Sequence, residues 1–138
     1  MPKKPLILCV EDDWNGLEGR KVLLEEIGCR VLASTSGVAA LHLFASYAID
    51  LVLLEYHMPE MRGDAMAACM KASHPEIPIV LLSADDELPE SALELVDVFV
   101  SKSESPANLL LIVEHLLDLH FLFTPIDDLI GGRQKYTV

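Results

Sequence analysis

The sequence predicts an α/β domain in which a doubly wound, five-stranded parallel sheet lies between two layers of helices, giving three layers in the order α/β/α. Short, almost continuously apolar segments, typical of strands buried on both faces, alternate along the chain with longer segments of helical character. Right-handed crossovers between parallel strands place such helices on both faces of the sheet. The chain of 138 residues is half apolar, so we expect it to bury the core of one domain.

The first strand and the first helix are separated by an acidic turn. Residues 6–10 are apolar and are followed at once by three consecutive acids. Asn15, with Glu18 three residues later, is typical of a helix capping box, and Gly28 is placed to end the helix. We therefore predict a strand at 6–10 and a helix that begins near Asn15 and ends near residue 27.

The remaining elements continue this alternation. Strands are predicted at residues 30–33, 51–54, 77–82 and 96–100, and helices at residues 37–47, 64–72, 89–95 and 106–120. The helix at 89–95 has the weakest pattern, whereas Pro106 suits the first turn of the last helix. The order therefore predicts five successive strand–helix units.

Polar residues lie just after the ends of four of the predicted strands. They are Glu11, Asp12 and Asp13 after the first strand, Glu55 after the third, Ser83 after the fourth and Lys102 after the fifth. In a doubly wound sheet, ligands bind beyond the carboxyl ends of the strands, where these side chains would converge. Converging carboxylates repel each other and favour a divalent cation such as Mg²⁺, while a lysine and a hydroxyl suit the oxygens of a phosphoryl group. The pattern therefore predicts a site for phosphoryl chemistry.

Four separated motifs, in this order along the chain, resemble those of the receiver domain of two-component response regulators. The segments at 6–13 and 50–63 resemble the strand with the acidic pair and the phosphoacceptor strand with its loop. The segments at 78–84 and 97–102 resemble the strands that carry the switch hydroxyl and the lysine. The resemblance covers residues 4–119 and implies a flavodoxin-like (CheY-like) fold and a role in phosphorelay signal transduction.

The resemblance also implies a metal site. Asp12 would be the main carboxylate ligand of Mg²⁺, assisted by Glu11, with Glu55 at the phosphoacceptor position. The backbone carbonyl of His57 would be a further ligand. Magnesium is therefore the expected cofactor, although it could be weakly bound or dispensable here.

Three more residues receive roles from the same resemblance. Ser83 would bond a phosphoryl oxygen, Lys102 would pair with it, and Phe99 would be the aromatic side chain that follows the switch. For Phe99, ordinary packing in the core fits the sequence at least as well.

Glu55 stands where the family has an aspartate. The extra methylene moves the carboxylate by about an ångström, a misplacement that can slow an in-line reaction by around 10²-fold. The longer side chain also carries negative charge toward Lys102 and Ser83, as a phosphomimetic would. Alternatively, Glu55 and Lys102 form only a structural ion pair.

We expect a stand-alone, atypical receiver that acts by protein–protein contacts and is not an enzyme, beyond transfer of a phosphoryl group to itself. The alternative is a functional, Mg²⁺-dependent phosphoacceptor that takes phosphate from a histidine kinase. A phosphatase on a similar sheet would need an aspartate nucleophile with a second aspartate two residues later, and residues 55–57 contain neither.

Two further departures lie near Lys102. Ser103 follows it where the family usually has proline, so we expect a trans or a strained peptide there, since a cis peptide without proline costs about 3 kcal/mol. The segment between Ser83 and Lys102 is nearly a helical turn shorter than is usual. We therefore expect a shortened or irregular fourth helix.

The composition limits the partners and the compartment. A formal charge of −12 argues against nucleic acid and anionic membranes as partners, because both require basic residues. The three cysteines, Cys9, Cys29 and Cys69, are odd in number and lie in apolar segments, which predicts buried thiols in a reducing compartment. The N-terminus has no signal-peptide core, so we expect a cytoplasmic protein.

The last helix is unusually apolar. Residues 109–123 are too few for a transmembrane helix and include Glu114 and Asp118. We divide the chain into a receiver domain at 1–120 and a tail at 121–138 that docks on the domain or contacts a partner. A homodimer through the last helix and tail is expected, besides contacts with a histidine kinase or a downstream effector.

Overall fold

The structure is a computed structural model in which residues 4–122 are described. Its strands are β1 (Leu6–Val10), β2 (Arg30–Ser34), β3 (Leu51–Glu55), β4 (Ile79–Ser83) and β5 (Val98–Ser101). Its helices are α1 (Trp14–Glu26), α2 (Gly37–Ser46), α3 (Gly63–Ser73), α4 (Glu90–Leu93) and α5 (Pro106–Leu122). The predicted order of elements is confirmed.

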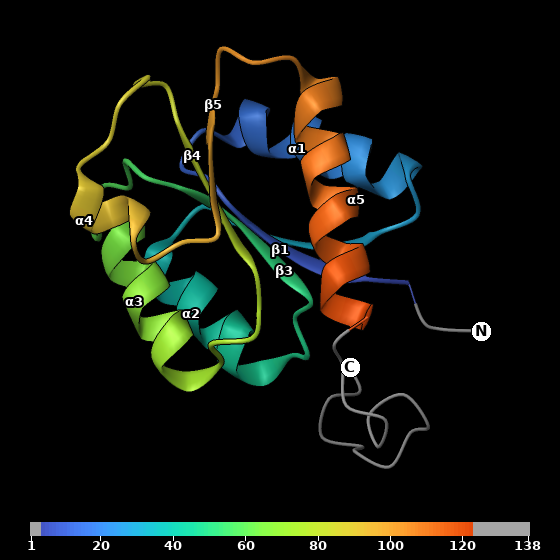
Figure 1. The fold of residues 1–138 in the computed structure, drawn as a ribbon, viewed down its shortest axis with the longest axis horizontal. Coiled ribbons are helices and arrows are strands. Elements are labelled where there is room, and N and C mark those ends of the chain that lie inside the picture. The colour runs from blue at the N-terminus through green and yellow to red at the C-terminus, as the bar shows by residue number, and fades with distance from the viewer. Residues whose placement is uncertain (1–3, 123–138) are drawn as a thin grey trace.

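The strands form one parallel sheet with the order β2-β1-β3-β4-β5. Helices α1 and α5 cover one face, and α2, α3 and α4 cover the other (Figure 1). The order of strands reverses between β1 and β3, which in doubly wound sheets is where ligands bind. The predicted three-layer α/β/α fold is therefore confirmed.

Each face of the sheet has its own core, because successive strand residues point to opposite faces. On the face of α1 and α5, Cys9 and Leu53 of the sheet pack with Leu17 and Leu117 of the helices. On the other face, strand residues such as Val52 pack in the core formed with α2 and α3. The central strands are thus buried on both faces, as their continuous apolar sequences predict.

Helix α1 begins at Trp14, slightly earlier than predicted, with Asp13 as its cap. The Asp13 carboxylate accepts a hydrogen bond from the Asn15 N–H at 3.3 Å, and the Asp13 carbonyl accepts the first helical bond, from the Leu17 N–H. The prediction of Asn15 as the cap was wrong, because an aspartate placed earlier in the same turn can satisfy free N–H groups of the first turn. Gly28 follows the end of the helix with a φ of 95°, as its predicted role requires.

Helix α4 is short, as expected, and covers less than the predicted 89–95. Beyond Leu93 the backbone continues in tight turns, in which the N–H groups of Leu95 and Val96 donate to carbonyls three residues earlier. The described backbone contains no cis peptide bond, so the peptide between Lys102 and Ser103 is trans. Both departures expected near Lys102 are therefore present.

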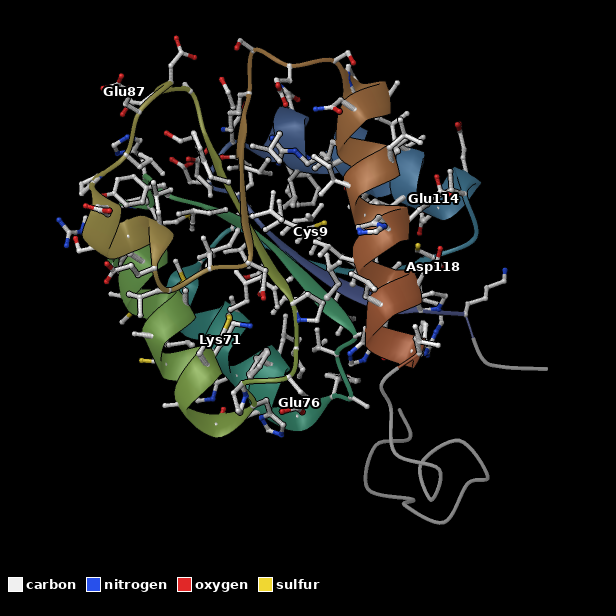
Figure 2. All side chains as sticks on the ribbon, in the orientation of Figure 1. Cys9, Lys71, Glu76, Glu87, Glu114 and Asp118 are labelled. Carbon is white, nitrogen blue, oxygen red and sulfur yellow. The ribbon has the colours of Figure 1, made fainter. Side chains whose placement is uncertain are left out.

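The cysteines do not all share one environment. Cys9 and Cys29 are buried, and Figure 2 shows Cys9 inside the fold, on the side of the sheet that α5 covers. Burial raises the pKa of the Cys9 thiol to about 12, so it stays neutral. Cys69 is exposed, and the prediction that it is buried was wrong, because it lies off the stripe of α3 that contains the buried Met66 and Met70.

Helix α5 extends to Leu122, two residues beyond the predicted end at residue 120. The rest of the predicted tail, residues 123–138, lies outside the described residues. Within residues 4–122, no helix combines the length and the apolar character needed to cross a membrane.

Candidate functional site

The carboxyl ends of β1, β3 and β5 bring three charged side chains together. The Lys102 Nζ lies 2.6 Å from Glu11 Oε1 and also forms an ion pair with Glu55 Oε1. Glu11 and Glu55 are only 1% and 3% exposed, whereas the Lys102 side chain is 29% exposed. The lysine therefore bridges two buried carboxylates.

The alternation of strand side chains explains this meeting. Two positions before each of the three charged residues, the chain has an apolar side chain. These side chains are Cys9, Leu53 and Val100, and all three pack in the core on the face of α1 and α5. Side chains two positions apart lie on the same face of a strand, so the three charged groups continue these rows beyond the apolar core. The structure therefore brings together strand-end side chains that the sequence predicts to converge.

Arg20 of α1 adds a second positive charge that the sequence reasoning missed. Its Nη2 atom lies 3.1 Å from Glu11 Oε1, and its side chain is only 16% exposed. Its position in the sequence could have indicated that Arg20 faces the sheet. The buried Leu17 and Leu24 lie three residues before it and four residues after it, on the same stripe of the helix. We call Glu11, Arg20, Glu55 and Lys102 the ion cluster.

Backbone donors complete the surroundings of the two carboxylates. Glu11 Oε2 accepts a hydrogen bond from the Asp13 N–H at 3.3 Å, and Glu55 Oε2 accepts one from the His57 N–H at 3.1 Å. The turns after β1 and β3 therefore both close onto the ion cluster.

The ion cluster shifts the pKa values of its members. Burial acts to raise the pKa of Glu11, but the hydrogen bond and charge of Lys102 outweigh it and hold that pKa below its ordinary value. Burial acts to lower the pKa of Lys102, but Glu11 and Glu55 raise it above its ordinary value. The pKa of the exposed Asp12 is raised, mainly by limited desolvation and to a smaller extent by the adjoining Glu11 carboxyl. At neutral pH the bridge between Glu11 and Lys102 is therefore fully charged.

These shifts predict how stability depends on pH. A carboxyl whose folded pKa is lowered contributes stability that is present above its unfolded pKa, here about 4.5, and is lost as the pH falls through the folded value. The raised pKa of Lys102 contributes stability that is present below about 10.5 and is lost only at higher pH. We expect the free energy of unfolding, measured in urea between pH 7 and pH 3, to fall below about pH 4.5.

Glu11→Gln is the control for this pH dependence. Because the amide does not titrate, the difference in stability between the wild type and this variant should shrink as the pH falls. Parallel curves for the two proteins would contradict the assignment to Glu11.

Ser83 lies at the end of β4 and is fully buried. Its hydroxyl accepts a hydrogen bond from the Asp85 N–H at 3.1 Å, and its carbonyl accepts one from the Lys102 N–H at 2.8 Å. Leu82 packs on the face of α1 and α5, so the side chain of Ser83 begins on the opposite face. Among the residues described, the Ser83 hydroxyl makes no hydrogen bond to Glu55 or to the Lys102 amine.

His57 has a side-chain contact that the sequence reasoning did not find. Its Nε2 atom lies 2.7 Å from Asp85 Oδ2, and both side chains are exposed. The contact joins the loops after β3 and β4, which are far apart in the sequence. The prediction for His57 concerned only its backbone carbonyl.

Phe99 is partly buried on β5. Its neighbours Val98 and Val100 pack on the face of α1 and α5, so Phe99 lies on the opposite face. Its role as a switch aromatic remains a prediction.

The predicted magnesium ligands do not form a ready site in this arrangement. The ion cluster contains two carboxylates and two cationic side chains, so its charges already balance. Asp12 is exposed, and within residues 4–122 no group of three or more His, Cys, Asp and Glu side chains is arranged to hold a metal ion. The residues fit a divalent cation only after a rearrangement, so the metal-binding roles of Glu11, Asp12, Glu55 and His57 remain predictions.

Comparisons with known proteins point to one family. A family model described as "Response regulator receiver domain" matches residues 7–114. The sensor protein GacS of Pseudomonas syringae is 36% identical over 87 residues, which are 59% of this chain and 10% of that protein. The uncharacterized transcriptional regulatory protein YbdJ of Bacillus subtilis is 30% identical over 126 residues, which are 89% of this chain and 56% of that protein. The chain thus spans about a tenth of the first relative and about half of the second.

Solved structures show the same fold. A CheY-like response regulator receiver domain protein from Methanospirillum hungatei has a TM-score of 0.83 at 22% identity, covering 88% of this chain and 100% of that one. The response regulator protein TrrA from Thermotoga maritima, in complex with Mg²⁺ and BeF, has a TM-score of 0.77 at 30% identity. That match covers 81% of this chain and 98% of TrrA.

Proposed function

The chain belongs to the response regulator receiver domain family of two-component signalling, and from this membership we propose that it is an atypical receiver whose signalling state is set by Glu55 and is passed on by protein contacts. In this proposal it is a signalling module without enzymatic activity of its own. A cytoplasmic location is part of the same proposal.

The observation that carries the proposal is the ion pair between Glu55 and Lys102. The Glu55 carboxylate is buried and already places its negative charge against the lysine amine. By resemblance to the family, that amine would otherwise pair with the phosphoryl group. Glu55 therefore acts as a built-in phosphomimetic. If the ion pair were only structural, the contacts would be the same, but no partner would respond to the charge of Glu55.

A second candidate is a phosphoacceptor that uses Mg²⁺ and a histidine kinase. It is favoured by the presence of Glu11, Asp12, Ser83 and Lys102 at the strand ends. The structure of TrrA, which was solved in complex with Mg²⁺ and BeF, supports it by analogy. This candidate requires Glu55 itself to accept phosphate.

Replacing Glu55 by aspartate tests the proposal. In the presence of Mg²⁺ and acetyl phosphate, we expect the wild type to keep its mass and Glu55→Asp to gain the mass of one phosphoryl group. The shorter carboxylate withdraws from Lys102 by about an ångström, which makes room for in-line attack. Its oxygen then bonds to phosphorus while the P–O bond to acetate breaks and acetate leaves.

Intact-mass measurement with peptide mapping gives the result. Glu55→Gln is the matched control, since it has the length of the wild-type side chain but no nucleophilic carboxylate. Phosphorylation of Glu55 in the wild type would overturn the proposal in favour of the second candidate. A Glu55→Asp variant that stays inert would show that Glu55 is not what prevents transfer.

The partner surface that we propose lies on α5. Leu111 and Leu122 are 66% and 70% exposed, and Leu119 is also exposed. Figure 2 shows Glu114 and Asp118 on the same helix, and both are exposed. An apolar surface with acidic neighbours suits a partner with apolar and basic groups, such as a histidine kinase or an effector. Dimerisation through the last helix remains a prediction.

A further inference from the structure

Arg20 supplies the ion cluster with a cation from inside the fold. Glu11 Oε1 accepts hydrogen bonds from both Arg20 Nη2 at 3.1 Å and Lys102 Nζ at 2.6 Å. We propose that Arg20 is a resident cation that takes the place of a divalent metal, so that Mg²⁺ binds here only when Arg20 leaves Glu11. This inference rests on the proposed function, because both take the site to be occupied by the protein's own side chains.

The balance of charge supports this competition. With Arg20 in place, the carboxylates of Glu11 and Glu55 are neutralised by two monovalent side chains. A divalent cation added to this arrangement would leave two excess positive charges in a buried setting, which is strongly unfavourable. If Arg20 leaves and the exposed Asp12 turns inward, three carboxylates instead balance Mg²⁺ and Lys102.

The Arg20 side chain is largely shielded from solvent. It is 16% exposed, and it approaches a carboxylate that is 1% exposed. Most surface ion pairs are weak because water competes with both partners, but burial removes much of that competition here. Displacing Arg20 therefore costs free energy, which weakens Mg²⁺ binding without preventing it.

A pocket beside the ion cluster gives Arg20 a place to go. It has a volume of about 310 Å³ and lies between α1 and the start of α5, with Arg20 and Lys102 in its wall. Asp13 and Glu104 also line this pocket. Each could receive the guanidinium once it has left Glu11, so Arg20 can move without losing a counter-ion.

Titration with Mg²⁺ alone tests the inference. Trp14 is the single tryptophan and the first residue of α1, directly after the acidic turn, so its fluorescence reports on binding there. We expect Arg20→Met, which keeps an apolar stem of similar length, to bind Mg²⁺ about tenfold more tightly than the wild type or better. The full chain is used without any phosphate donor.

Lys21→Met is the matched control. It removes the same charge from the neighbouring position of α1, but Lys21 pairs with Glu25 and not with the ion cluster. Its Mg²⁺ affinity should stay within about twofold of the wild type, because the Lys21 charge is 35% exposed and is therefore partly screened by salt. An Arg20→Met affinity no higher than that of Lys21→Met overturns the inference.

Arg20→Gln and thermal melting keep the inference testable if Arg20→Met misfolds. The glutamine removes the charge but keeps a hydrogen-bond donor, and it should show the same tighter binding. Mg²⁺ should also raise the melting temperature of both variants more than that of the wild type. If neither variant gains affinity or metal-dependent stability, Arg20 is not a substitute for the metal. An inert Glu55→Asp variant would count against the proposed function and not against this result.

Discussion

Replacing Lys102 by methionine is expected to lower the free energy of unfolding by about 3 kcal/mol. Removing one partner of a buried ion pair typically costs about 3–5 kcal/mol, because the other charge is left uncompensated. Two carboxylates lose their bridge here, but the lysine is 29% exposed and water can partly replace it, so we expect the lower end of that range. Urea unfolding at pH 7 measures the change.

A second variant identifies the cause of this loss. Adding Glu55→Gln to Lys102→Met removes the buried charge that the lysine had neutralised, so the double variant should recover a large part of the lost stability. A loss of less than about 1 kcal/mol in Lys102→Met would contradict the prediction, since that is the usual range of an exposed pair.

Gly63→Ala is expected to destabilise the fold by at least about 1–3 kcal/mol, the usual cost of forcing extra atoms into a packed core. The N-terminus of α3 packs closely on the end of β3, and a Cβ at Gly63 would lie 2.5 Å from the Glu55 carbonyl oxygen. It would also lie 2.9 Å from both Leu81 Cδ1 and Tyr56 Cα. Since two of these three atoms are backbone atoms, the end of β3 must move and carry Glu55 with it.

Gly19→Ala provides the control for this prediction. Gly19 is an exposed glycine inside α1, and a Cβ there would meet no other atom within 4 Å. Alanine is a better helix former than glycine by about 1 kcal/mol, so this variant should be slightly more stable than the wild type. Thermal or urea unfolding of the two variants should therefore move in opposite directions, and a neutral Gly63→Ala would contradict the close packing of α3 on β3.

The two predictions concern one structural unit. Lys102 holds Glu55 by its charge, while Gly63 lets α3 approach the backbone of the same residue. A change at either position alters where the Glu55 carboxylate lies. Both variants should therefore disturb any partner contact that depends on Glu55, even though neither residue need touch the partner.

The sequence alone determined the sheet and the main charged residues of the site. Continuous apolar segments identify strands that are buried on both faces, and parallel strands must end at one edge of the sheet. The positions of Glu11, Glu55 and Lys102 at the ends of such segments therefore predicted their meeting. This inference needs only the period of a strand and the direction of the chain.

Only the tertiary structure decided which side chains and turns complete the site. The contact of Arg20 with Glu11 depends on how α1 is rotated against the sheet, and the contact of His57 with Asp85 depends on the approach of two loops. Asp13 caps α1 because of the path of the turn after β1. Such contacts join residues by orientation and distance in space, and local patterns of hydrophobicity contain neither quantity.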